Sequence, residues 1–193
     1  MASTALALPD ARLHGSWAEA LRDFGASFPH GSGVDPAAPP ALDRAGCAAF
    51  VADRLAYADP AGAELPPHRV RCTYFWILDA GPRADPRDGV VGFLAVRHAL
   101  SDFLLEQGGH IGFSVRPSAR RRGHASSALR LGLDHAAALG LDRVLLTCDP
   151  DNAGSRRTIE AAGGVYEDTR AATQRFWIET VRTRAGGGVR SLR

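Results

Sequence analysis

The sequence contains no lysine, so all 23 of its basic residues are arginines. Against 21 acidic residues they leave a formal net charge of only +2. A balance this small argues against nucleic-acid binding, which usually needs a clear excess of positive charge. The missing lysine also excludes a Walker A phosphate loop, and no Gly-x-Gly-x-x-Gly dinucleotide fingerprint occurs.

Cysteine and long apolar runs are equally scarce. Cys47, Cys72 and Cys148 are an odd number, and no two have Cys-x-x-Cys spacing. We therefore expect three reduced thiols, no disulfide framework and no metal site. The first ten residues lack a basic segment, and no run of 18 apolar residues follows. These absences predict no export signal, no membrane segment and a cytoplasmic location.

What the sequence does contain fits one α/β domain, with 45% hydrophobic residues in a chain of 193. Apolar spacing of three and four predicts N-terminal helices over 15–28 and 42–57, separated by a Gly/Pro/Ala-rich loop at 29–40 that could act as a lid. Further strands and helices are expected after these. The strands are 70–78, 90–97, 110–115, 144–148 and 175–181, and the helices are 125–139 and 152–162. We expect 1–69 to hold helices and loop, 70–181 the sheet and cofactor core, and 182–193 a frayed tail.

A cluster of arginines lies between a predicted strand and a predicted helix. It comprises Arg120, Arg121 and Arg122 and is followed by Gly123, His124, Ala125 and Ser126. Unpaired amides at a helix N-terminus attract anions, and small residues there let phosphate oxygens approach closely. Alone, such a run is more commonly a solvated surface.

Several motifs agree in order and spacing with one superfamily. Val115-x-Pro117 precedes Arg-x-x-Gly-x-Ala at 120–125, and Asn152-x-x-Ser155 follows the next strand, with Glu160 and Gly163 closing its helix. Over residues 90–180 the chain resembles the GNAT superfamily of N-acetyltransferases, and especially a group of bacterial predicted acetyltransferases. The resemblance implies a mixed, mostly antiparallel central sheet flanked by helices, with splayed central strands at 110–115 and 144–148.

The resemblance also implies acetyl-CoA as co-substrate. The backbone of Phe113, Ser114 and Val115 would pair with its pantetheine arm, and Arg120 to Ser126 would hold the pyrophosphate, largely through main-chain amides. Asn152 and Ser155 would lie near the pantetheine end. For His124 only the amide is expected to matter, with its side chain in solvent.

Catalysis requires an amine of pKa about 10 to lose a proton before it attacks the thioester. His110, at the start of the central strand, is the candidate base, and Glu106 could assist or replace it. The alternatives are a buried histidine that satisfies backbone groups and a solvated loop acid. The helix position that often holds a proton-donating tyrosine in the superfamily is Ile159 in this chain.

The predicted function is therefore acyl transfer to a small-molecule or peptide amine, without nucleic acid or membrane partners. A catalytically inactive acyl-CoA-binding regulatory module remains an alternative. Asp102 and Glu106 could attract the amine. If the strand at 175–181, with Phe176 and Trp177, is an edge strand, it could support a homodimer.

Overall fold

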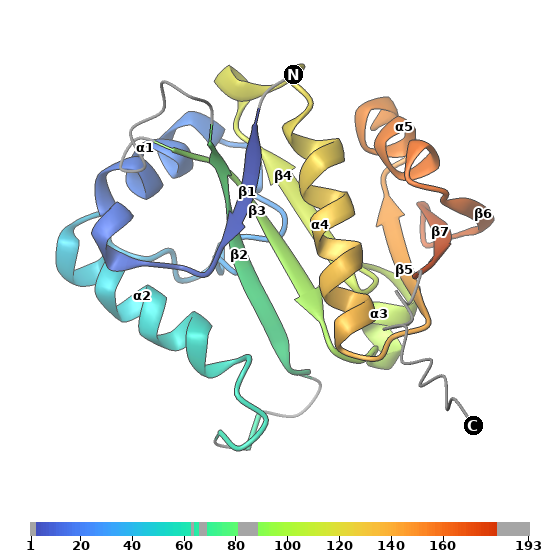
Figure 1. The fold of residues 1–193 in the computed structure, drawn as a ribbon, viewed down its shortest axis with the longest axis horizontal. Coiled ribbons are helices and arrows are strands. Elements are labelled where there is room, and N and C mark those ends of the chain that lie inside the picture. Colours follow the sequence, from blue (N-terminus) through green and yellow to red (C-terminus); the bar gives the residue numbers. More distant parts are fainter. Residues whose placement is uncertain (1–2, 63, 66–68, 81–88, 181–193) are drawn as a thin grey trace, which may run out of the picture.

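The computed structural model describes residues 3–62, 64–65, 69–80 and 89–180, and its strands form two antiparallel sheets that lie side by side (Figure 1). The four-stranded sheet has the order β1 (Thr4–Ala7), β2 (Cys72–Asp79), β3 (Val90–Arg97) and β4 (Ile111–Val115). The three-stranded sheet has the order β5 (Arg143–Cys148), β7 (Thr173–Glu179) and β6 (Val165–Arg170). The fold is therefore α/β with antiparallel sheets flanked by helices, as predicted.

Helices cover both faces of the four-stranded sheet. Helices α1 (His14–Phe24) and α2 (Arg44–Ala56) pack on one face, and α4 (His124–Ala138) packs on the other. Helix α5 (Ala153–Ala161) lies beside α4 and β5. A short helix, α3 (Asp102–Glu106), follows β3, and 3-10 turns occur at Ala11–Leu13 and Pro117–Ala119.

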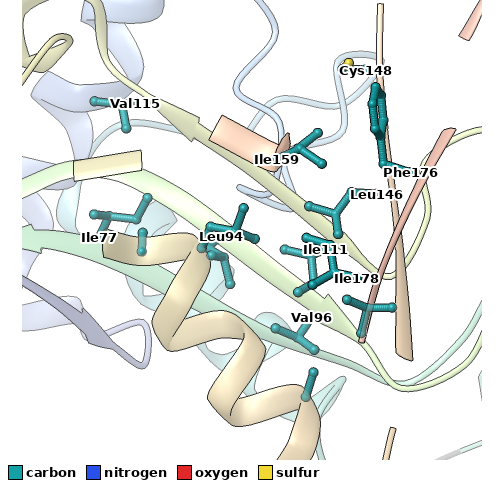
Figure 2. Close-up of a cluster of buried hydrophobic side chains, with 14 of the residues drawn as sticks. Ile77, Leu94, Val96, Ile111, Val115, Leu146, Cys148, Ile159, Phe176 and Ile178 are labelled. Atoms are coloured by element: carbon teal, nitrogen blue, oxygen red, sulfur yellow. The ribbon is translucent and has the colours of Figure 1, made fainter. Parts of the chain in front are cut away.

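Alternation along β2 and β3 divides the core between these two faces. Trp76 and Phe93 point toward α1 and α2, where Trp17 stacks on Trp76 with ring centroids 6.2 Å apart. Their neighbours Ile77 and Leu94 point the other way, into a cluster that continues beneath α4 into the second sheet (Figure 2). Each such side chain contributes about 1.5–3 kcal/mol by leaving water. One continuous apolar layer thus holds the two sheets together.

Backbone pairing between the sheets is confined to the start of β4. The N–H of His110 donates to the Leu145 carbonyl (2.7 Å), and the Leu145 N–H donates to His110 Nδ1 (2.9 Å). Gly109 permits this approach because an added Cβ would lie 2.3 Å from the Leu145 oxygen. No ladder joins β4 to β5. The predicted splay of the central strands is confirmed.

The sequence predicted most elements but not all of them. Strand β1, edge strand β6 and helix α3 were not expected. Helix α1 ends at Phe24 because Gly25 takes a φ of +55°, which leaves Phe28 in the following loop. The proposed edge role of 175–181 is wrong, since β7 lies between β5 and β6. The expected tail at 182–193 lies outside the described residues.

Other expectations concern thiols, metals and membranes. Cys47, Cys72 and Cys148 are all free and buried, as predicted. Within the described residues, no three His, Cys, Asp or Glu side chains gather as a metal site would require. No helix in the same part of the chain has the length and apolarity to span a membrane.

Candidate active site

A cleft of about 1540 Å³ runs past β4 between the helix-covered faces. One part, which we call the cofactor half, is lined by β4, by residues 119–121 and 123–126, and by residues 147–149, 152, 154, 155, 157 and 158. The other part, the acceptor half, is lined by residues 30–36 and by side chains of α2, β2, β3 and α3. The strand edge of β4 separates the two halves.

The outward edge of β4 carries unused backbone groups. The N–H of Arg97 donates to the His110 carbonyl and that of Arg116 to the Val91 carbonyl, both at 2.8 Å. Because antiparallel residues alternate in direction, the N–H and C=O of Phe113 and Val115 point away from β3. The Val115 carbonyl accepts from Arg120 Nε (3.0 Å). Within the described part of the chain, the N–H and C=O of Phe113 therefore face the splay without a hydrogen-bond partner.

Beyond this edge, helix α4 begins without a side-chain cap. Its N-cap Gly123 is left-handed (φ 91°), and the preceding loop holds Arg121 at φ 64°, an uncommon conformation for a residue with a Cβ. By contrast, α5 is capped, because Asn152 Oδ1 accepts from the Ser155 N–H (3.0 Å). The first amides of α4 thus remain open at the cleft, where the helix dipole favours an anion.

The expectation that the His124 side chain points to solvent is wrong. It is 1% exposed, with Nδ1 3.0 Å from Thr4 Oγ1 and Nε2 3.7 Å from Asp79 Oδ2. Burial lowers the pKa of His124, while Asp79 acts to raise it. The first turn of α4 directs this side chain beneath the sheet, toward β1 and β2. Its imidazole therefore contacts β1 and β2, and its amide is left for the cleft.

All predicted cofactor residues except Arg122 line the cleft, but neither Arg122 nor the two predicted catalytic residues do. His110 is 7% exposed, and burial, with a smaller effect of Arg97, lowers its pKa to about 4. Glu106 forms an ion pair with Arg170 at 2.8 Å. Their catalytic roles remain predictions, and the geometry gives both side chains structural contacts.

A match to a protein-family model shows which family the chain belongs to. Residues 34–165, more than half of the chain, match the acetyltransferase (GNAT) domain model. The chain belongs to the GNAT acetyltransferase family. No curated protein matches the chain significantly.

Solved structures share this GNAT fold at low sequence identity. Mycobacterium smegmatis RimJ in complex with CoA-disulfide is 20% identical, with a TM-score of 0.63 over 91% of this chain and 81% of that one. The ribosomal-protein-S5-alanine acetyltransferase of Vibrio fischeri is 16% identical, with a TM-score of 0.63 over 92% and 93%. The microcin self-immunity acetyltransferase MccE, with acetyl-CoA and AMP, is 12% identical, with a TM-score of 0.60 over 91% and 92%.

The GNAT motifs gave no indication of the acceptor half. Its roof, residues 30–33, is fixed against β4: Ser114 Oγ donates to the His30 carbonyl (2.7 Å), and a Cβ on Gly31 would lie 2.3 Å from the Gly112 oxygen. Arg54 Nη1 donates to the Gly33 carbonyl (2.7 Å). The segment predicted as a possible lid is therefore held to both β4 and α2. In the sequence of this segment, only the glycines indicated that its backbone could approach β4 so closely.

Desolvation shifts the pKa values of ionisable groups in the acceptor half. Burial raises the pKa of Cys72 to about 11 and also raises that of the Tyr74 hydroxyl. His30 is exposed at the cleft, but partial desolvation by its neighbours lowers its pKa, while Asp149 raises it and Arg97 lowers it. Neutral imidazole is thus favoured at His30 near neutral pH, and an uncharged imidazole can accept a proton.

Ile159 contributes no acid to this site. It is 1% exposed and packs in the core shared by Leu146 and Phe176 (Figure 2). The position at which the resemblance to the superfamily predicts a proton-donating tyrosine therefore holds a buried apolar side chain.

Proposed function

We propose that this GNAT protein transfers the acetyl group of acetyl-CoA to a primary amine by direct attack in a ternary complex. The observation that carries the proposal is the continuity of the free β4 edge with the uncapped start of α4. A strand edge can pair with an extended amide-bearing arm, and an open helix N-terminus can hold phosphate. These two features meet in one cleft in the order that acetyl-CoA requires.

The residues present fit the groups of acetyl-CoA. Phe113, Ser114 and Val115 would flank the pantetheine arm, with the outward amides of Phe113 and Val115 pairing with it. Gly123, His124, Ala125 and Ser126 would offer amides to the pyrophosphate. A Cβ on Gly123 would meet no atom within 4 Å, so the space beside the loop is open for phosphate oxygens.

Charged and polar side chains would complete the cofactor half. Arg120, Arg121 and Arg122 are exposed and would neutralise the phosphates. Ser155 and the amide nitrogen of Asn152 would lie beside the pantetheine end, since Asn152 Oδ1 is already used as a cap. Acetyl-CoA would supply an activated thioester, and similar structures of RimJ and MccE carry CoA-disulfide and acetyl-CoA, respectively.

For the amine's proton we propose His30 in preference to His110. His30 is exposed and lines the cleft, whereas the Nδ1 of His110 is occupied by the Leu145 N–H. The His30 ring is braced edge-on by Phe28, with ring centroids 4.9 Å apart. His30 would accept the amine's proton directly or through one water. His110 would instead hold the strands at the point where they separate.

Calorimetric titration of acetyl-CoA tests the cofactor half. In Gly123→Trp a bulky side chain enters the open space, and we expect binding to be lost. Gly163→Trp is the matched control, because Gly163 has nearly the same φ (93° against 91°), equally open space and no place in the cleft. Equal loss in both variants would indicate backbone strain instead of a blocked site. No binding to the wild type would refute the proposal.

Thiol release in the presence of amines then separates an enzyme from an acyl-CoA-binding module without turnover. For His30→Gln we expect the acid limb of the pH profile of kcat/KM to disappear while acetyl-CoA affinity is unchanged. An acid limb identical to that of the wild type would exclude His30 as the base.

A further inference from the structure

Among the described residues, one half-buried cation of the acceptor half lacks an acidic partner. Arg97, at the end of β3, is half-buried and lines the cleft. Its Nη1 donates to the carbonyls of Gly108 (3.1 Å) and Gly109 (2.9 Å). Throughout the described residues, its guanidinium has no carboxylate partner, and its Nε and Nη2 donate to no protein acceptor. Partly buried charges are normally paired, so the unused donors of this guanidinium are available to bind an anion from outside the chain.

The other charged residues of the acceptor half also leave an excess of positive charge around Arg97. Arg54 and Arg69 line the same half, which has Asp35 as its carboxylate. Arg54 is already matched, because it pairs with Asp53 and lies over the rings of Phe50, Tyr57 and Tyr74. Arg97 has no such compensation. With Asp149 as the other carboxylate of the cleft, an acceptor with an anion opposite Arg97 and an ammonium opposite Asp149 fits these charges better than a polyamine does.

We propose that the acceptor is a small amine that also carries an anionic group, a carboxylate or a phosphate ester, and that Arg97 binds this group. The proposal rests on the acetyltransferase function and specifies its substrate class. Guanidinium forms two parallel hydrogen bonds to either anion, which fixes orientation as well as affinity. The free Nε and Nη2 of Arg97 are the pair of donors that this geometry uses.

The surroundings of Arg97 place the amine of such an acceptor toward the splay. Gly112 of β4 adjoins Arg97, since a Cβ there would lie 3.8 Å from Arg97 Nη1. His30 is within electrostatic reach of both Arg97 and Asp149, the residue directly after β5. An acceptor held by Arg97 would therefore direct its amine across Gly112 toward His30 and Asp149. Asp149 would favour the ammonium form on entry, and His30 would receive its proton.

Matched acceptor pairs test this inference. One pair is an amino acid and its amide, and the other is phosphoethanolamine and ethanolamine; within each pair only the first member adds the anion. The kcat/KM of each is measured by thiol release with wild type, Arg97→Gln, Arg97→Lys and Arg130→Gln. Arg130 is an exposed residue of α4 outside the cleft and controls for the loss of one arginine.

We expect wild type to prefer the anionic member of at least one pair by about tenfold or more, as a charge-assisted pair of hydrogen bonds allows. Arg97→Gln should remove that preference by raising KM for the anionic member much more than for the neutral member. Arg97→Lys should retain part of it, and Arg130→Gln all of it. The pair with the larger effect identifies carboxylate or phosphate.

Three outcomes would overturn the inference. They are a wild-type preference for the neutral members, an absence of turnover for every anionic member, and an equal loss for both members in Arg97→Gln. The last would mean that Arg97 only supports the Gly108–Gly109 loop. Calorimetry with acetyl-CoA on the same samples distinguishes these failures from failure of the acetyltransferase function, because that function predicts binding whatever the acceptor.

Discussion

Replacing His110 by asparagine would keep the hydrogen bond that His110 accepts but remove the group that titrates. The buried Leu145 N–H donates to His110 Nδ1, so this nitrogen must stay unprotonated in the folded protein. Burial, followed by the charge of Arg97, lowers the pKa of His110 from 6.5 to about 4. An asparagine Oδ1 can accept the same hydrogen bond but does not titrate in this range.

The direction of the pH effect follows from these two pKa values. As pH falls below 6.5, the unfolded chain binds a proton at His110 while the folded chain does not. The stability contributed by neutral His110 is thus complete above about pH 6.5 and is lost as pH falls toward 4. At about 1.4 kcal/mol per pKa unit, the full effect is about 3 kcal/mol, of which about 2 kcal/mol is lost between pH 7 and 5.

Urea denaturation at pH 7, 6 and 5 measures this contribution. The wild type should lose about 2 kcal/mol more than His110→Asn across the range, after the titration of other histidines has cancelled in the difference. His110→Ala is the control for the hydrogen bond, since it leaves the Leu145 N–H unpaired and should cost about 1–3 kcal/mol already at pH 7. An asparagine variant as sensitive to pH as the wild type would refute the assignment.

Three further substitutions probe other contacts. Arg175→Gln should lower the unfolding free energy in urea by about 3 kcal/mol, because Arg175 is 1% exposed and pairs with Glu167 and Asp168; an unchanged midpoint would contradict this. His124→Ala should lower the melting temperature yet leave the acetyl-CoA Kd within about twofold by calorimetry, because only its amide faces the cleft. A large loss of affinity would show that the side chain positions the loop. Ile159→Tyr should cost about 1–3 kcal/mol through overpacking and should not raise kcat; faster turnover would show that a hydroxyl there reaches the thiolate.

The helices and strands predicted from the sequence are those whose apolar residues recur at regular spacing. Apolar spacing identified α4, and a left-handed Gly140 (φ 86°) follows its end. The missed elements lack such signals. Strand β1 has four half-buried residues without alternation, and the edge strand β6 (Val165–Arg170) is largely polar and exposed. Helix α3 has five residues, too few to show a helical period.

The two halves of the site differ in predictability for a physical reason. The cofactor half is built from consecutive residues, because a strand end, a loop and a helix start must follow one another to present amides to an anion. The acceptor half is assembled from contacts between distant segments. Gly31 packs on Gly112, and His30 accepts from Ser114, 84 positions away. No spacing within either segment predicts this contact.

The splay itself has a local cause that the family resemblance alone did not supply. In a regular ladder, the Leu145 N–H would donate to a backbone carbonyl, and neighbouring strands would continue about 4.8 Å apart. Here the donor is satisfied by the imidazole of His110, while the His110 carbonyl already accepts from Arg97. The imidazole thus takes the place of a backbone carbonyl. The Leu145 N–H has a hydrogen-bond partner, although no ladder between β4 and β5 continues from it. Further along β4, the outward N–H and C=O of Phe113 and the outward N–H of Val115 are left for a ligand. Their separation from β5 follows from the histidine that ends the pairing.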